Sequence, residues 1–346
     1  MTIVENARPV IGGVDTHLDV HVAAAVDANG GLLGVESFTT KPEGLDALQQ
    51  WLCSFGPVAK VGVEGTGAYG AELARHLRRC GHEVIEVDRP NRQLRRRVGK
   101  SDSIDAVEAA RAALSGRASG IAERADGDVE AIRALLVARR SARDARITYL
   151  NQIRQLSFTA PGELRERFRA VTGPHLARTA AALRPNVATD PVMFATKIAM
   201  QSLGRRVVDL DADCARLDAL LDEFTQRRAP GLRAVYGVGV HAAAVLLVAA
   251  GDNPERLRNE AAFAALCGVS PLPTSSGKII RYRLNPGGNR QANHALWRIV
   301  FTRMAAEPRT RAYVERRLAE GRTKREIMRI LKRYVAREIF PHLAMR

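Results

Sequence analysis

The first hundred residues alternate between short apolar runs and amphipathic stretches. Five apolar runs have the length of strands and are bounded by turn-forming residues. The predicted strands are Val10–Val14, Asp19–Val26, Leu32–Phe38, Lys60–Val63 and Glu83–Val87. Helices are expected from Pro42 to about Phe55 and from about Ala68 to Arg79. The order βββαβα, followed by a strand, predicts an α/β domain at residues 1–120.

Beyond Lys100 the strand signals nearly vanish. Gly127 to about Phe158 forms an arginine-rich helical pattern, and the four prolines within 159–191 predict broken helices and turns. We expect a helical linker at 121–230 and a mainly helical domain at 231–346.

One helix of the linker carries a regular apolar seam with alternating spacings of four and three residues. The seam consists of Leu203, Val207, Leu210, Cys214, Leu217, Leu221 and Phe224. Such a heptad pattern predicts a coiled-coil hairpin or a dimer contact. An amphipathic helix packed on its own domain is the simpler alternative.

The chain is strongly basic, with 53 lysines and arginines against 37 acidic residues and a formal net charge of +16. An excess of arginine favours a nucleic-acid partner over an ordinary basic surface. The four cysteines have no metal-ligand spacing, which argues against structural zinc and disulfides and fits a reducing cytoplasm. The most apolar stretch, Val235–Ala250, is too short to cross a membrane.

Four acidic residues carry the candidate chemistry. Asp15 and Glu64 end predicted strands, while Asp102 and Asp105 lie three apart on a predicted helix and so share one of its faces. Clustered carboxylates repel one another unless cations neutralise them. Two divalent ions would suit in-line phosphoryl transfer. Taken singly, each acid could instead be a cap or turn residue, with Ser101 or Asp102 capping the helix.

The glycines that follow Glu64 match a dinucleotide fingerprint, GTGAYG at 65–70. Glu64 would then lie beside a bound pyrophosphate, and the arginine-rich helices replace the further βα units that such a domain needs. We interpret the glycines as a sharp turn beside Glu64.

Basic residues cluster at two places. The run at 89–100 contains no acid and lies just before Asp102. It is therefore expected to bind a nucleic-acid backbone near the metals; a solvated helix face is the alternative. The second cluster follows the hydroxyl block at 274–276. The predicted nucleic-acid-binding residues are Arg92, Arg95, Arg96, Arg97, Lys100, Lys278, Arg281, Arg283 and Arg290.

Two further motifs lie in the last region. Tyr236–Ala244 resembles a helix-hairpin-helix turn, which suits sequence-independent phosphate binding; a simple helix corner is the alternative. Ser275 and Ser276, flanked by cations, could supply a serine nucleophile for phosphate. A polar loop is the simpler interpretation of that block.

The order of the strands, with a carboxylate at the end of the first and the fourth, resembles the RNase H-like (RuvC-like) nuclease fold. The blocks GVDTH, VGVEGTGAYG, VGKSDSIDA, CGVSP, SSGK and GGNRQANHAL resemble the DEDD transposases of bacterial insertion sequences, the family of the Piv invertase. This resemblance covers the chain in order. It implies a RuvC-like domain, a coiled-coil linker and a C-terminal transposase domain.

The resemblance further implies that Asp15, Glu64, Asp102 and Asp105 bind Mg²⁺ and that a serine forms a covalent link to DNA. Ser275 is the first choice. The family commonly has a second glycine after SSG, where this chain has Lys278, so Ser276 stays open. Relatives use a structured RNA from the element's ends to pair with donor and target DNA. The expected partners are therefore the element ends, target DNA and a guide RNA, and the chain is expected to form a dimer or tetramer. The expected localisation is the bacterial cytoplasm, in association with the nucleoid.

The function expected from the sequence is that of a DNA recombinase that moves its own element. A RuvC-type nuclease that hydrolyses DNA with water and a catalytically inactive nucleic-acid-binding protein are the rivals. A sugar-kinase-like ATPase is more distant, since GVDTHLDVHVAAAVDANG also resembles the first hairpin of that fold.

Overall fold

The computed structural model of the chain separates into two units by its internal contacts. The sheet unit contains residues 1–127 and 250–258, and the helical unit contains 128–249 and 259–346. The structure describes residues 9–87, 101–118, 120–121, 127–252, 257–274, 282–283 and 285–343.

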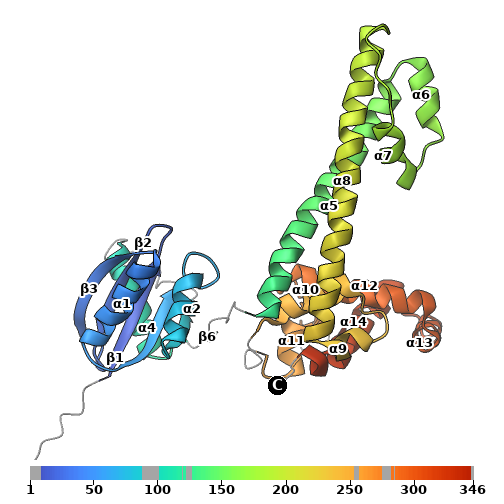
Figure 1. Cartoon of the computed structure of the whole chain (residues 1–346). Coiled ribbons are helices and arrows are strands. Elements are labelled where there is room, and N and C mark those ends of the chain that lie inside the picture. Colours follow the sequence, from blue (N-terminus) through green and yellow to red (C-terminus); the bar gives the residue numbers. More distant parts are fainter. Residues whose placement is uncertain are drawn as a thin grey trace, which may run out of the picture. The chain divides into compact units, whose positions relative to one another are not determined.

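The sheet unit is built on a mixed sheet with the strand order β3-β2-β1-β4-β5-β6 (Figure 1). Its strands are β1 (Val10–Thr16), β2 (Val20–Val26), β3 (Leu32–Thr39), β4 (Val58–Glu64), β5 (Glu83–Val87) and β6 (Gly120–Ile121). The first three strands are antiparallel, β4 and β5 run parallel to β1, and β6 is antiparallel to β5. The predicted α/β domain is confirmed; the two-residue β6 was not predicted.

Helices cover both faces of the sheet where its strands are apolar on both sides, as β1 and β2 are, whereas β3 is mostly exposed. Side chains of α1 (Pro42–Ser54) and α2 (Ala71–Arg79) pack with Val10 and Val14 on one face. Those of α4 (Asp102–Leu114) pack with Ile11 on the other.

The helical unit contains a long antiparallel hairpin of α5 (Asp128–Thr159) and α8 (Pro191–Arg228) (Figure 1). The two helices are antiparallel, because ion pairs join the start of α5 to the end of α8 and continue in opposite directions along the two helices. These pairs are Asp128–Arg227, Arg139–Asp218 and Arg146–Asp211. At the tip, α6 (Gly162–Arg169) and α7 (Pro174–Ala181) pack on the hairpin through buried residues that include Phe168 and Met200.

The seam predicted on α8 is buried or half-buried along its whole length. Leu203 and Val207 pack with Ile153 of α5, so at that end the seam lies against a helix of the same chain. The hairpin alternative accounts for this contact. Coiled-coil packing and a dimer contact through α8 stay predictions, as does the separation of linker from C-terminal domain.

The remainder of the helical unit is a group of helices with one short ribbon of β7 (Leu272–Pro273) and β8 (Tyr282–Arg283). The helices are α9 (Pro230–Ala234), α10 (Val240–Ala250), α11 (Glu260–Leu266), α12 (Arg290–Ala306), α13 (Pro308–Ala319) and α14 (Lys324–Leu343). The expected mainly helical C-terminal region is confirmed. Among the described residues, no helix has the length and apolar character to cross a membrane.

Candidate metal centre

Parallel pairing of β1 with β4 brings two of the predicted acids to one edge of the sheet. Val14 pairs with Val63, so Asp15 and Glu64 follow at neighbouring positions. Asp15 is 7% exposed and Glu64 is half-buried. Both line a cavity of about 300 Å³, together with Asp105.

Two glycines allow α4 to lie directly on the strands that carry these acids. A Cβ atom at Gly13 would lie 2.2 Å from the Ala106 carbonyl oxygen, and one at Gly62 would lie 2.5 Å from that of Ala109. The helix presents alanines to the sheet, which keeps this approach close. The first turn of α4 is thereby held at the edge where Asp15 and Glu64 lie.

Ser101, rather than Asp102, caps α4. Its hydroxyl oxygen accepts a hydrogen bond from the Ile104 amide at 3.3 Å. The carboxylate of Asp102 is therefore not used as the cap, and its side chain is half exposed. Asp105, one turn on, is 3% exposed. The structure thus gathers all four predicted acids at one edge of the sheet.

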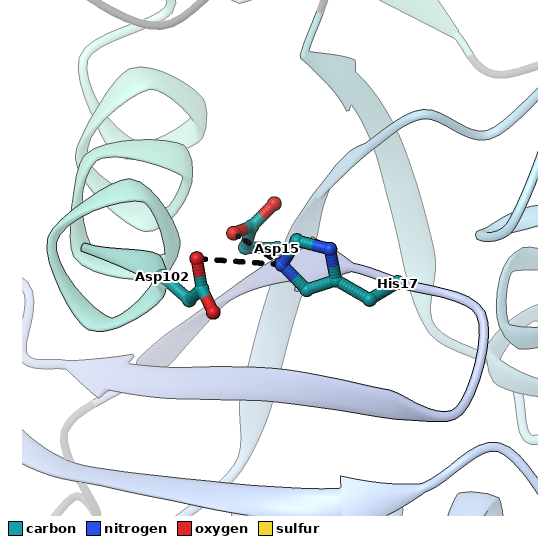
Figure 2. Close-up of side chains that lie close together, drawn as sticks. All are labelled: Asp15, His17 and Asp102. Carbon is teal, nitrogen blue, oxygen red and sulfur yellow. Dashed lines mark hydrogen bonds and ion pairs between the residues drawn. The ribbon is translucent and has the colours of Figure 1, made fainter. Parts of the chain in front are cut away.

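His17 is a member of this cluster that sequence reasoning missed. Its Nε2 atom lies 3.2 Å from Oδ2 of Asp15 and 3.4 Å from Oδ1 of Asp102 (Figure 2). Ligand atoms of the three residues lie within 4.8 Å of one another, a spacing suited to one ion. The signal was in the sequence: side chains two apart along an extended chain share a face.

The electrostatics of the cluster favour a bound cation. Burial raises the pKa of the Asp15 carboxyl; His17 opposes this shift, and the carboxylates of Asp105 and Asp102 add to it. A divalent cation would offset the repulsion between these carboxylates and favour the ionised form of Asp15. Carboxylate oxygens are the ligands that Mg²⁺ and Mn²⁺ prefer, and Mn²⁺ also accepts imidazole. The residues present therefore fit a divalent metal of this kind.

The turn after β4 is held by hydroxyl groups. Gly65 has a φ of 72°, in the region that favours glycine. The Thr16 hydroxyl donates to the Glu64 carbonyl at 2.7 Å, and the Thr66 hydroxyl donates to Glu86 Oε1 at 2.8 Å. These contacts agree with the interpretation of the glycine motif as a sharp turn beside Glu64.

Most of the predicted basic and hydroxyl residues lie outside the described part of the chain. These are Arg92, Arg95, Arg96, Arg97, Lys100, Ser275, Ser276, Lys278 and Arg281. Arg283 on β8 and Arg290 at the start of α12 are described, and both are exposed on the helical unit. Their roles stay predictions.

The GGNRQANHAL block has a structural role at the start of α12. The Asn289 amide donates to the Leu266 carbonyl at 2.6 Å, and its side chain accepts from the Gln291 amide at 2.9 Å. Asn293 Nδ2 donates to the Cys267 carbonyl at 2.8 Å and its Oδ1 accepts from Lys332 Nζ at 2.8 Å. The block thus ties α12 to the CGVSP segment and to α14. Sequence reasoning did not single out Lys332.

Two family models match the chain, one after the other; the first covers most of the sheet unit and continues into α5, and the second lies in the helical unit. A model of IS110-type DEDD transposases, described as "Transposase", matches residues 12–157. A second model, described as "Transposase IS116/IS110/IS902 family", matches residues 229–315. Streptomyces coelicolor has a similar protein, named "Insertion element IS110 uncharacterized 43.6 kDa protein", which is 38% identical over 120 residues. That match covers 34% of this chain and 29% of the relative.

The chain has an α/β unit with clustered carboxylates and a helical unit. Together with the two family matches, these features identify the class as DEDD-type transposases. The chain belongs to the IS116/IS110/IS902 transposase family. The resemblance drawn from the sequence motifs is confirmed.

Proposed function

We propose that the chain is a DNA recombinase of an insertion element that cuts and rejoins DNA strands. The observation that carries the proposal is the cavity lined by Asp15, Glu64 and Asp105, with Asp102 beside it, in a chain of a transposase family. The strand order and the position of α4 support an RNase H-like fold for the sheet unit. The net charge of +16 suits a DNA substrate.

The carboxylates have distinct parts in this proposal. Asp15, which is buried between β1 and α4, would be the central ligand of Mg²⁺ or Mn²⁺, with Glu64 and Asp105 on either side. Asp102 and His17 are exposed and would complete the site at its rim. A divalent ion bound there supplies positive charge against the developing charge on phosphate. The protein's own contribution is to hold the ligands close together, because Gly13 and Gly62 allow α4 to pack directly on β1 and β4.

We assign both strand cleavage and its reversal, the rejoining step, to a serine. The oxygen of Ser275, or of Ser276, would attack the phosphorus of a phosphodiester while the bond to the leaving strand breaks and that strand takes up a proton. The new phosphodiester joins serine to DNA and conserves the bond energy, so that a strand hydroxyl can reverse the step without ATP. Lys278, Arg281, Arg283 and Arg290 would bind the phosphate in this step.

The serine block and the carboxylates belong to different units of the chain, which suggests a site completed only around DNA. We propose a homo-oligomer, a dimer or tetramer, on element ends and target DNA, with a structured guide RNA as in similar proteins. This assembly rests on the resemblance described above.

The test compares carboxylates inside and outside the cluster. Glu64→Gln should abolish Mg²⁺-dependent strand cleavage in an excision assay, whereas Glu36→Gln, an exposed residue on β3 of the same sheet, should leave it unchanged. Asp102→Asn and the exposed Asp46→Asn on α1 form a second matched pair. DNA attached to protein after denaturation would support the serine, and its loss in Ser275→Ala would assign it.

Other outcomes favour the rivals. Products with free ends and no adduct would indicate a RuvC-type nuclease. DNA binding without cleavage by the wild-type protein, over a range of Mg²⁺ and Mn²⁺ concentrations, would indicate an inactive nucleic-acid-binding protein. Cleavage that persists in Glu64→Gln would reject the metal site.

A further inference from the structure

A cavity of about 860 Å³ lies wholly within the helical unit. Residues of α5, of the turn at 235–239 and of α12 line it, and Figure 1 shows these elements where α5 begins and α8 ends. The turn is the one that resembles a helix-hairpin-helix. Gly237 has a φ of 82° there, and the buried Arg303 donates to the Tyr236 carbonyl at 2.9 Å, which fixes the turn against α12.

The lining of the cavity is strongly basic, with six arginines and one aspartate. Three of the arginines are neutralised: Arg139 by Asp218, Arg233 by Asp222 and Arg143 by Asp144. Arg140, Arg290 and Arg298 have no carboxylate partner within the described part of the chain, and all three are exposed. Arg140 is directed by a 2.6 Å hydrogen bond to the side-chain oxygen of Gln291.

His241, at the start of α10, reports the positive potential of this cavity. Burial lowers the pKa of its imidazole, and the charge of Arg139 lowers it further. Asp218 opposes this shift, and Arg143 and Arg140 add smaller effects that lower the pKa. An anion in the cavity would offset these charges. The cavity is therefore suited to phosphate groups.

Aromatic rings extend from the cavity along one face of α12. His294, which lines the cavity, stacks on Trp297 with ring centroids 5.4 Å apart, and Trp297 stacks on Phe301 at 5.3 Å. Phe301 is 54% exposed, and Tyr236, across the turn, is 50% exposed. We call His294, Trp297 and Phe301 the ring ladder. Exposed rings beside arginines suit unpaired bases, whose faces are free to stack, better than duplex, whose bases already stack on one another.

We propose that this cavity and the ring ladder bind a single-stranded segment of nucleic acid. Arg140 and Arg298 bind phosphates of the strand, and its bases stack on the ladder. The inference rests on the proposed function in taking nucleic acid as the partner. It uses none of the carboxylates, so binding here and cleavage at the metal centre can be tested separately.

The experiment uses the full chain and its own fluorescence. The sequence contains two tryptophans, so Trp51→Phe leaves Trp297 as the reporter. Short oligothymidylate, oligouridylate and a duplex of the same length are titrated, with affinities also measured by anisotropy over a range of salt. Single strands are expected to quench Trp297 and to bind more tightly than duplex.

Two pairs of variants test the contacts. Arg140→Ala with Arg298→Ala should weaken single-strand binding about tenfold or more and reduce the log–log salt slope by about 1.4, since each bound phosphate contributes about 0.7. Arg205→Ala with Arg309→Ala, which removes the same charge from exposed positions outside the cavity, should not. Phe301→Ala should weaken binding about tenfold, the order expected for a stacked base. Phe158→Ala, at another exposed phenylalanine of the helical unit, should leave it unchanged.

The outcomes separate the possibilities. Tighter binding of oligouridylate identifies an RNA strand and tighter binding of oligothymidylate a DNA strand, and both support the site. If the cavity variants are folded by circular dichroism and bind single strands with wild-type affinity, the proposal is overturned. An equal loss of affinity for duplex and for single strands also overturns it. A change in molecular mass for Phe301→Ala without a change in oligonucleotide affinity would make the ladder a protein interface and also overturn it. Asp15→Asn should bind the oligonucleotides as the wild type does, even though it fails to cleave.

Discussion

Gly13→Ala provides a direct test of how the acidic cluster is assembled. The added Cβ would lie 2.2 Å from both the Ala106 carbonyl oxygen and the Ala110 amide nitrogen of α4. These are main-chain atoms, so no side-chain rotation relieves the clash. Because non-bonded heavy atoms settle at about 3.5–4 Å, α4 must move outward by roughly 1 Å or more.

Two effects of opposite sign decide the change in stability. Alanine in a strand is favoured over glycine by about 0.5–1 kcal/mol, while overpacking a close-packed core costs about 1–3 kcal/mol or more. The clash involves rigid backbone on both sides, so the upper part of that range applies. We expect a net decrease of about 2 kcal/mol in the free energy of unfolding and a weaker metal site, since Asp102 and Asp105 move with α4.

The measurement is urea denaturation followed by tryptophan fluorescence. In a Trp297→Phe background Trp51, on α1, reports the sheet unit alone. Gly67→Ala is the matched control, because a Cβ at Gly67 meets no atom within 4 Å. If Gly13→Ala were as stable as Gly67→Ala and bound Mn²⁺ equally well, α4 would not be held at this distance and the proposed assembly of the cluster would be wrong.

Three further predictions concern other parts of the molecule. His17→Ala should weaken Mn²⁺ binding more than Mg²⁺ binding by calorimetry, because imidazole suits the transition metal, and His82→Ala should affect neither; equal losses for both ions would remove His17 from the ligands. Leu210→Asp with Leu217→Asp should destabilise the hairpin and reduce the molecular mass in light scattering; an unchanged mass would reject assembly through α8. Neutralising the three arginines at 95–97 should lower the salt slope of DNA binding by about one for each phosphate that is no longer bound, and an unchanged slope would make this run a solvated surface.

Local patterns were sufficient to predict much of the sheet unit. Apolar runs bounded by turn residues identified the first five strands, and the parallel order placed Asp15 beside Glu64. The depth at which α4 packs was not predictable, because it depends on which glycine of one strand meets which alanine of a distant helix. The spacing of two residues could have placed His17 on the same face as Asp15, but its contact with Asp102 of α4 follows only from the tertiary structure.

The helical unit shows a second limit of sequence patterns. A heptad seam looks the same whether its partner is another helix of the chain or a second copy, so the pattern on α8 did not identify α5 as the partner of Leu203 and Val207. The basic cavity combines Arg140 on α5 with Arg290 and Arg298 on α12, residues more than a hundred positions apart. No local pattern joins them. β7 and β8 are two residues long, too short for periodicity to register.

The acidic cluster should make the stability of the sheet unit depend on metal. Asp15→Asn should be more stable than the wild type without metal and less stable with it. The pKa of Asp15 is raised in the folded state, so its stabilising contribution is complete only below the unfolded pKa and is lost as the pH rises through the folded pKa. At neutral pH without metal, the ionised form therefore opposes folding, and Asp15→Asn, which resembles the protonated form, should be more stable than the wild type. With metal at about 100 times its dissociation constant, the wild type should gain about 2.7 kcal/mol, whereas the variant, lacking a central ligand, should gain little. Urea titrations with and without Mn²⁺ should thus show the order of the two proteins invert. If Asp15→Asn is the less stable protein under both conditions, the carboxylate is a structural partner within the fold, and the cluster has no need of a cation.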